Sequence, residues 1–151
     1  MYKHILIPTD GSKLSQQSAE TGVRLAKALG ARVTAFFAAP PATPIIYKAM
    51  LPVGYTTPEE HERMSRKAAQ AYLGAIEEAA RAAGVRCESL SVTSDFPADA
   101  ILAAAAKRRC DLIFMASHGR RGLRRASLLG SETQKVLSQA PVPVLVHRAG
   151  K

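Results

Sequence analysis

The sequence predicts an α/β domain in which helices cover both faces of a five-stranded parallel sheet. Short apolar runs alternate along the chain with longer stretches in which apolar residues recur every three or four positions. Strands that alternate with helices in this way are typical of parallel sheets. The length of 151 residues and the hydrophobic content of 47% suit one domain over residues 1–151.

The first strand and helix are predicted near the amino terminus. Residues 3–9 are almost continuously apolar and lead into Pro-Thr-Asp-Gly-Ser, which is typical of a buried strand followed by a turn. Ser12 or Ser15 can cap the next helix, and Gly30 can end it. Residues 32–39 are then expected to form the second strand.

The rest of the chain continues this alternation after one long loop. Residues 40–58 are rich in proline and show neither a helical nor a strand period. Loops of this length are usually functional, so we expect a lid or a partner surface there. The other predicted elements are a helix from Pro58 to Gly84, a strand over 85–93, a helix opened by Pro97, a strand over 111–116, a helix over about 131–139 and a last strand over 143–147.

Charge and hydropathy narrow the class of protein. The formal net charge of +9 can indicate an anionic partner. Part of this excess lies in residues 107–109, which we interpret as a solvated helix end because cations offset the helix dipole there. No apolar run is long enough to cross a membrane, and Asp10 comes too soon for a signal peptide. We therefore expect a cytoplasmic protein with neither a membrane nor a nucleic acid as its partner.

Cysteine and histidine give no indication of a metal or redox site. Cys87 and Cys110 do not form a Cys-x-x-Cys pattern, and we expect both to be structural thiols. The histidines are widely separated and lack the spacing of metal ligands, which argues against a zinc site. They are His4, His61, His118 and His147.

The glycine-rich, arginine-bearing segment from Gly119 to Ser131 is the strongest candidate for a binding site. Gly119 and Gly122 lack a Cβ atom, so an anion can approach the backbone N–H groups closely. Gly130 and Ser131 open a helix whose first N–H groups have no partner within the helix, and the Ser131 hydroxyl adds a donor. These features predict a phosphate site, although the sequence contains neither a Walker-type loop nor a dinucleotide fingerprint.

Asp10 adds a second side to this site. Ligands of open parallel sheets bind outside the carboxyl ends of the strands, where the strand order reverses. If the first and fourth strands are neighbours there, Asp10 and Gly119 face the same crevice. A carboxylate in that position can accept hydrogen bonds from ribose hydroxyls or help to hold a hydrated magnesium ion.

Each of these residues also has an explanation that needs no ligand. Gly119 and Gly122 can be turn glycines, and Asp10 can cap the first helix. Ser131 can cap the last helix, and the arginines can be solvated. The binding site is favoured because all of these features converge on one edge of the predicted sheet.

The chain resembles the universal stress protein family over essentially its whole length. The resemblance implies a Rossmann-like sheet of the adenine nucleotide alpha hydrolase-like type, a homodimer and a role in bacterial stress survival. The ATP-binding members carry a glycine, two residues, a glycine, nine residues and then Gly-Ser or Gly-Thr. The segments that carry the resemblance are 3–12, 96–101, 111–119, 129–131 and 141–146.

The chain departs from the ATP-binding motif in two places. Ala116 stands where the first glycine belongs, and ten residues separate Gly119 from Gly130. The alanine adds a methyl group near the expected ribose or phosphates, and the extra residue lengthens the arginine segment. Neither change removes an N–H donor, so we expect nucleotide binding to survive both.

The resemblance also implies individual binding residues and partners. The ligand would be ATP, AMP or ADP, with or without Mg²⁺. Family members pair the last strand, here Val142 to His147, across a two-fold axis, and the prolines at its start are typical of an edge strand, so we expect a homodimer. The adenosine side would comprise Pro8, Thr9, Asp10 and Ala38, and the ribose and phosphate side Met115, Ala116, Gly119, Arg120, Gly122, Gly130 and Ser131.

The expected function is that of an adenine-nucleotide-binding stress protein that acts through ligand-dependent conformation or choice of partner. No nucleophile and base pair or acid pair indicates catalysis, so we do not expect an enzyme. Two alternatives stay open. One is a slow ATPase or autokinase that transfers phosphate to Ser117, Ser127 or Ser131, and the other is a nucleotide-free module whose arginines bind anionic partners.

Overall fold

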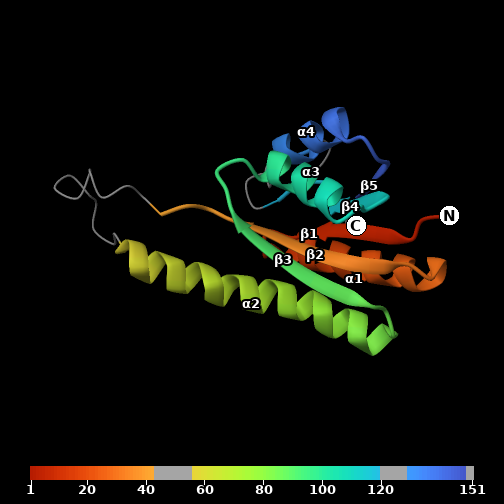
Figure 1. Ribbon diagram of the computed structural model, residues 1–151, viewed down its shortest axis with the longest axis horizontal. Helices are drawn as coiled ribbons and strands as arrows, with labels where there is room; N and C mark the ends of the chain where they lie inside the picture. Colours follow the sequence, from red (N-terminus) through yellow and green to blue (C-terminus); the bar gives the residue numbers. More distant parts are fainter. Residues whose placement is uncertain (43–55, 120–128, 149–151) are drawn as a thin grey trace.

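The computed structural model describes residues 1–42, 56–119 and 129–148, and strands and helices alternate along them as predicted (Figure 1). The strands are β1 (His4–Pro8), β2 (Arg32–Ala39), β3 (Cys87–Thr93), β4 (Leu112–Ala116) and β5 (Val144–His147). The helices are α1 (Lys13–Leu29), α2 (Pro58–Ala83), α3 (Pro97–Lys107) and α4 (Ser131–Gln139). Most of the predicted lid or partner surface lies outside the described residues. So do the four arginines of the segment from Gly119 to Ser131, which are Arg120, Arg121, Arg124 and Arg125.

The described strands form one parallel sheet in the order β3-β2-β1-β4-β5, which confirms the predicted fold class. The chain runs outward from β1 through β2 to β3. It then crosses to β4, on the other side of β1. The strand order therefore reverses between β1 and β4, which is where ligands of open parallel sheets bind.

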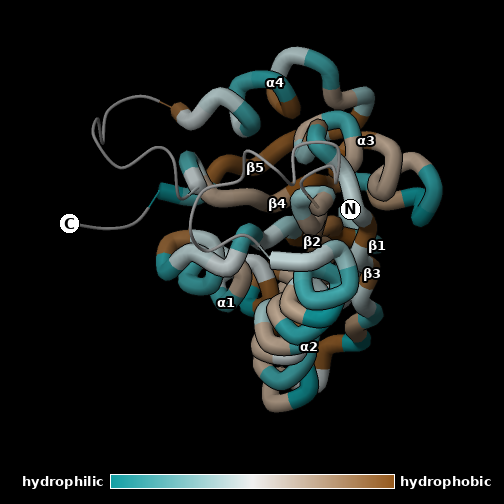
Figure 2. The backbone as a smooth tube through the Cα atoms, turned by 90° about the vertical axis from the view of Figure 1, so that its left-hand side faces the viewer, coloured by the Kyte–Doolittle hydropathy of each residue, from teal (hydrophilic) through white to brown (hydrophobic). Residues whose placement is uncertain are grey.

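Helices cover both faces of the sheet. The views along the strands and across them place α1 and α2 on one face and α3 and α4 on the other (Figures 1 and 2). Ile5 and Ile7 of β1 belong to the core under α1 and α2, whereas Leu6 belongs to the core under α3 and α4. This burial on both faces explains why β1 is continuously apolar and does not alternate.

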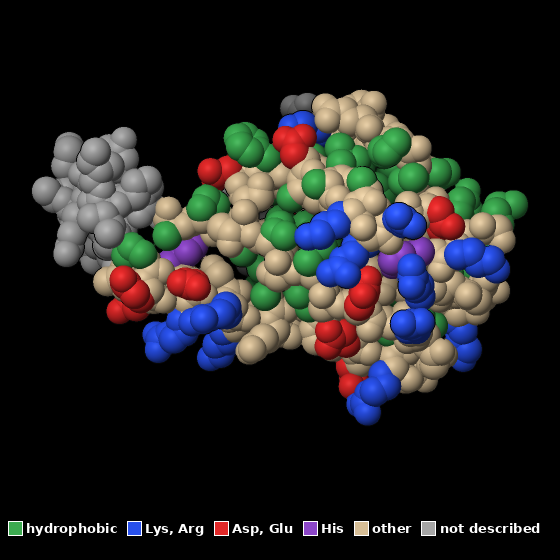
Figure 3. All heavy atoms as spheres, in the orientation of Figure 1, with side chains coloured by type: hydrophobic (Ala, Val, Ile, Leu, Met, Phe, Trp, Pro, Cys, Tyr) green, Lys and Arg blue, Asp and Glu red, His purple; other side chains and the backbone are tan. Residues whose placement is uncertain are grey.

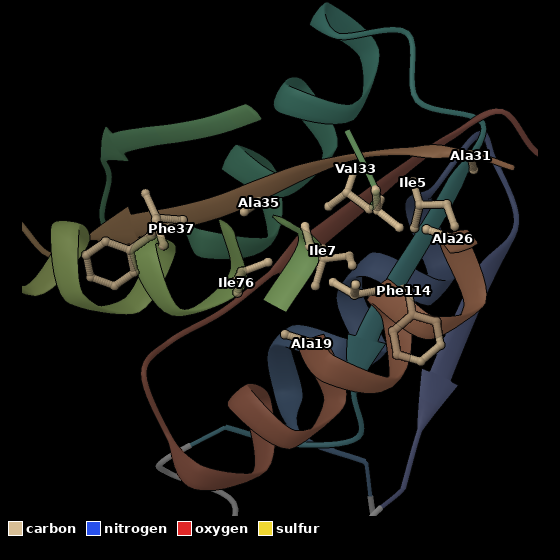
Figure 4. Close-up of a cluster of buried hydrophobic side chains, with 14 of the residues drawn as sticks. Ile5, Ile7, Ala19, Ala26, Ala31, Val33, Ala35, Phe37, Ile76 and Phe114 are labelled. Atoms are coloured by element: carbon tan, nitrogen blue, oxygen red, sulfur yellow. The ribbon is translucent and has the colours of Figure 1, made fainter. Parts of the chain in front are cut away.

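The larger of the two cores joins residues from distant parts of the chain (Figure 4). Phe37 of β2, Ile76 of α2 and Phe114 of β4 are between 1% and 6% exposed. Burial of a side chain of this size contributes about 1.5–3 kcal/mol to the free energy of unfolding. This core holds β1 and β4 in fixed positions at the centre of the sheet, and so it fixes the strand ends that follow.

The helix ends and the cysteines agree with the predictions. Ser12 is the N-cap of α1, where its hydroxyl accepts a hydrogen bond from Ser15 N at 3.2 Å, and Gly30 ends the helix in the left-handed conformation. Cys87 and Cys110 are free thiols, and burial raises the pKa of both to about 11. They stay protonated at neutral pH, as structural thiols do. Among the described residues, none of the helices combines the length and the apolar character that a membrane span needs.

Candidate functional site

The carboxyl ends of β1 and β4 bring Asp10 and Gly119 into contact. The two strands are neighbours, with Leu6 opposite Ile113. A Cβ atom added to Gly119 would lie 2.1 Å from Asp10 Oδ2, which is far shorter than any van der Waals contact. The Asp10 carboxylate therefore occupies the space that a side chain at position 119 would need, and any larger residue there would have to displace it.

The turn after β1 holds the Asp10 carboxylate in place. Ser12 N donates a hydrogen bond to Asp10 Oδ1 at 2.9 Å, and Gly11 N donates to Thr9 Oγ1 at 3.1 Å. The buried hydroxyls of Thr9 and Ser15 lie 3.0 Å apart. Ser12 caps α1, so Asp10 is not the helix cap that the ligand-free explanation requires.

Tyr72 of α2 packs against this turn and was not predicted as a site residue. Gly11 has a φ of 79°, and a Cβ atom added to it would lie 2.2 Å from the Tyr72 ring. The ring also meets Phe37 edge-on, with the centroids 5.3 Å apart. The sequence places Tyr72 only on the buried face of a helix. Its contact with a glycine some sixty positions away depends on the tertiary fold.

The start of α4 is joined tightly to the end of β4. Gly130 N donates to the Ser117 carbonyl at 2.8 Å, and Thr133 Oγ1 donates to the Ala116 carbonyl at 3.1 Å. A Cβ atom on Gly130 would lie 3.1 Å from the Cα atom of His118. Gly130 is the N-cap and Ser131 the first helical residue, so the ligand-free explanation of Ser131 as the cap is wrong.

The N-terminus of α4 carries no side-chain cap from the described residues. Its dipole places partial positive charge at this end, and the first backbone N–H groups point out of the helix. Glu132, the acid of the first turn, accepts a hydrogen bond from Ala98 N at the start of α3 at 2.7 Å. That carboxylate is thus engaged with the neighbouring helix, and the start of α4 is suited to an anion from outside.

The predicted site residues of the described chain lie at the carboxyl edge of the sheet. Thr9 and Met115 are each 6% exposed and Ala116 is 7% exposed, so these three residues offer mainly backbone groups to a ligand. The others are Pro8 at the end of β1, Ala38 opposite Val92 near the end of β2, Asp10 and Gly119 at the strand ends, and Gly130 and Ser131 at the start of α4. Arg120 and Gly122 lie outside the described residues.

A second polar contact near this edge was also not predicted. Ser18 Oγ of α1 lies 2.8 Å from His147 Nδ1 at the end of β5, and the His147 ring stacks on Phe114 with centroids 5.9 Å apart. His147 O accepts a hydrogen bond from Ser117 N at 2.9 Å. Ser18 lies on the buried face of α1 and is only 2% exposed, and a buried hydroxyl needs a polar partner. A serine at a core position of the predicted helix is the sequence signal that could have indicated this contact.

Two further features limit what the site can be. A hollow of about 750 Å³ lies between α2 and β3, and none of the predicted site residues lines it. The described residues contain no group of three or more His, Cys, Asp or Glu that could hold a metal ion. The site is therefore an edge with a carboxylate on one side and backbone donors on the other.

Comparison with known proteins identifies the family. The model of the universal stress protein family matches residues 1–148. A universal stress protein of Methanocaldococcus jannaschii is 32% identical over 154 residues, covering 100% of this chain and 85% of that protein. Another, from Thermus aquaticus, is 34% identical over 148 residues and covers 98% of this chain and 100% of the relative.

Solved structures share the fold over nearly the whole chain. A universal stress protein family member from Burkholderia pseudomallei has a TM-score of 0.75 and 21% identity, covering 98% of this chain and 97% of that one. A universal stress protein in complex with cAMP has a TM-score of 0.66 and 22% identity, with 97% of each chain covered. The Archaeoglobus fulgidus protein in complex with dAMP has a TM-score of 0.65 and 18% identity, covering 96% and 97%.

The family assignment rests on the sequence matches. The structural neighbours, at this level of identity, show only that the fold is shared. The family model covers almost every residue, and two relatives exceed 30% identity over almost the whole chain. This chain belongs to the universal stress protein family.

Proposed function

We propose that this universal stress protein binds an adenine nucleotide at the carboxyl ends of β1 and β4 and acts in the stress response as a nucleotide-dependent binding or regulatory protein. The observation that carries the proposal is the contact between Asp10 and Gly119, where a Cβ atom would come within 2.1 Å of the carboxylate. This contact lies at the reversal of strand order, the usual ligand position in such sheets.

The two sides of the site have complementary roles in this proposal. Asp10 accepts hydrogen bonds from the ribose hydroxyls. The N–H groups at the start of α4, together with the Ser131 hydroxyl, donate to the phosphates. Arg120 and Gly122 would complete the phosphate side. A magnesium ion would arrive with the phosphates and share Asp10, because the described residues provide no metal cluster of their own.

Two structural neighbours support an adenine nucleotide as the ligand. They have the same fold and were crystallised with cAMP and with dAMP. Ala116 is only 7% exposed, so its methyl group takes up little of the surface that is open to a ligand. The autokinase alternative loses one acceptor, because Ser117 is 5% exposed and its hydroxyl lies 3.2 Å from His118 Nδ1. The proposed location is the cytoplasm, where free adenine nucleotides are available.

Thermal unfolding in the presence of AMP, ADP, ATP or cAMP tests the proposal. A ligand present at 100 times its Kd stabilises the folded state by about 2.7 kcal/mol, which raises Tm by roughly 5–10 °C in a chain of this size. Gly130→Asp places a carboxylate at the proposed phosphate position, so we expect it to abolish this rise in Tm.

Gly130→Asn is the matched control for Gly130→Asp. Both side chains crowd His118 equally and both are favourable helix N-caps, so the two variants differ mainly in charge. The asparagine variant should keep part of the nucleotide-dependent rise in Tm. If the wild-type protein shows no rise at millimolar concentrations of all four nucleotides, the proposal is wrong.

A further inference from the structure

A hollow lined by four cations lies at the amino ends of the strands, at the opposite edge of the sheet from the proposed nucleotide site. It has a volume of about 460 Å³ and forms where β1, β2 and β3 begin and where α1 and α2 end. Its cations are Lys3, Lys27, Arg32 and Arg86, and no described Asp or Glu lines it. We call it the basic hollow. Figure 3 shows Lys and Arg side chains gathered over this end of the molecule, on the right of the view.

The backbone brings three of the four cations together at neighbouring strand starts. Arg32 N donates to the Lys3 carbonyl at 3.0 Å, and Val33 N donates to the Arg86 carbonyl at 2.8 Å. In this register Arg32 pairs with His4 and Val33 pairs with Cys87, so Arg32 lies beside Arg86, and Lys3 lies one residue further toward the amino edge. Neighbouring strands are about 4.8 Å apart, so all three cations belong to adjacent strand starts. Lys27 adds a fourth charge from the last turn of α1. Like charges this close repel one another, and an anion with several charges relieves that repulsion.

The ion pairs of the fold leave these cations available. The four ion pairs found among the described residues join other partners, and one of them holds Arg108 of the nearby turn 3.6 Å from Glu88. Lys3, Lys27, Arg32 and Arg86 are all exposed.

Helix capping does not explain the basic hollow either. The N–H group of Gly30 donates to the carbonyls of Ala26 and Lys27, and Gly84 does the same at the end of α2. The helix ends thus obtain their donors from the backbone. A cation near a helix C-terminus offsets the dipole, which accounts for Lys27. Lys3, Arg32 and Arg86 lie at strand starts, where no helix dipole calls for a positive charge.

The features of the basic hollow fit a chain of phosphates without bases. Four cations around one hollow match an anion whose charge repeats along its length. Single-stranded nucleic acids are held by aromatic side chains on which the bases stack, but none of the residues lining the hollow is aromatic. Tyr2, beside Lys3, packs against the larger core. A concave site formed by chain turns also offers no helix or ribbon to enter the groove of a duplex.

We propose that the basic hollow binds inorganic polyphosphate, with Lys3, Lys27, Arg32 and Arg86 contacting its phosphates. This site is separate from the proposed nucleotide site, because the two lie at opposite ends of the strands. Polyphosphate and nucleotide can then be bound at the same time. The inference does not depend on nucleotide binding.

Isothermal titration of the full chain with sodium polyphosphate of defined length tests this inference at several salt concentrations. The double variant Lys27→Gln and Arg86→Gln should weaken binding at least tenfold. The plot of log K against log salt, which falls as salt rises, should also become less steep by about one to two, because two phosphate contacts are lost. Lys3→Gln with Arg32→Gln should have the same effect from the other half of the hollow.

Arg63→Gln with Lys67→Gln is the matched control, since it removes the same charge from two exposed positions of α2 outside the hollow. It should leave the affinity within about twofold of wild type. Equal losses in the control and in the hollow variants would mean diffuse attraction and would overturn the proposal. So would displacement of polyphosphate by AMP. Single-stranded RNA that binds as tightly as polyphosphate and depends on the same four cations would also overturn it, in favour of a nucleic-acid surface.

Discussion

At the scale of single residues, the contact between Asp10 and Gly119 makes the most direct prediction. Gly119→Ala adds a methyl carbon 2.1 Å from the present position of Asp10 Oδ2, so the carboxylate must move. We expect nucleotide binding to weaken at least tenfold, because a displaced Asp10 no longer faces the ribose. The affinity for AMP, measured by isothermal titration, checks this.

Gly74→Ala is the control for this change. Gly74 lies within α2, and nothing comes within 4 Å of an added Cβ atom. The substitution should raise the free energy of unfolding by up to about 1 kcal/mol, since alanine favours a helix more than glycine does. It should leave AMP binding unchanged. Unchanged AMP binding in Gly119→Ala would show that Asp10 has no part in holding the ligand.

His4 predicts a pH dependence of stability. It is 3% exposed, and its Nε2 lies 2.7 Å from Thr34 Oγ1. Burial first, and then the charge of Arg32, hold the pKa of His4 below 6.5, although Glu88 and Asp111 oppose them. The unfolded chain therefore binds this proton more readily. The free energy of unfolding should fall as the pH drops below about 6.5, by at most about 1.4 kcal/mol per pH unit.

Urea unfolding at a series of pH values from 7.5 to 5 measures this slope. His4→Gln keeps a polar group beside Thr34 but cannot titrate, so the slope over this range should become shallower. His61→Gln removes a histidine at the start of α2, where Nε2 lies 2.8 Å from the Pro40 carbonyl, outside the core. The slope should stay steeper in that variant than in His4→Gln. Equal slopes in the two variants would contradict the role assigned to His4.

At the scale of elements, the sequence predicts limits well wherever a local signal sets them. Gly30 and Gly84 end their helices, and Pro58 and Pro97 begin theirs, because the conformational preferences of glycine and proline act within a few residues. The start of α3 is marked only in part, because Pro97 is not preceded by a residue that can cap the helix. Its N-cap position is occupied by Phe96, which offers no capping atom. The donor at Ala98 is satisfied by Glu132, and no local pattern can predict a cap that comes from another helix.

This remote cap makes a prediction about the pair of helices. Glu132→Ala removes the acceptor 2.7 Å from Ala98 N and also the negative charge at the start of α3. The free energy of unfolding should fall by about 1–2 kcal/mol, the usual cost of losing an N-cap. In Glu132→Gln the free energy of unfolding should fall by less, because the amide oxygen still accepts the hydrogen bond. Urea unfolding at pH 7 measures both values.

Glu20→Ala is a suitable comparison for the Glu132 variants. Glu20 is exposed on α1 and takes part in none of the ion pairs found in the described chain. Its removal should change the free energy of unfolding by less than about 0.5 kcal/mol. If Glu132→Ala costs no more than this, the cap contributes little to joining α3 and α4.

At the scale of the whole molecule, the order of the strands decides which predicted residues meet. The sequence indicates parallel strands and marks the ends of β1 and β4 with Asp10 and Gly119, but the proximity of these ends could only be stated as a condition. Strand order depends on which apolar faces pack together, and contacts such as Phe37 with Tyr72 join residues far apart in the chain. The site was thus predictable in its components, whereas its geometry and its support from Tyr72 required the fold.

The same strand order leaves β5 at an edge of the sheet, and this makes a prediction about assembly. An exposed edge strand can pair with a second copy of itself across a two-fold axis, which is the homodimer we propose. Leu145 of β5 is 39% exposed and Leu137 of α4 is 40% exposed, so apolar surface accompanies the free edge. Leu145→Lys should convert a dimer to a monomer, because two lysines would meet near the axis.

Met64→Lys, at a residue of α2 that is 56% exposed, removes apolar surface elsewhere and should leave the dimer intact. Sedimentation equilibrium of the three proteins at matched concentrations measures their masses. A wild-type chain that sediments as a monomer at tens of micromolar would rule out this assembly.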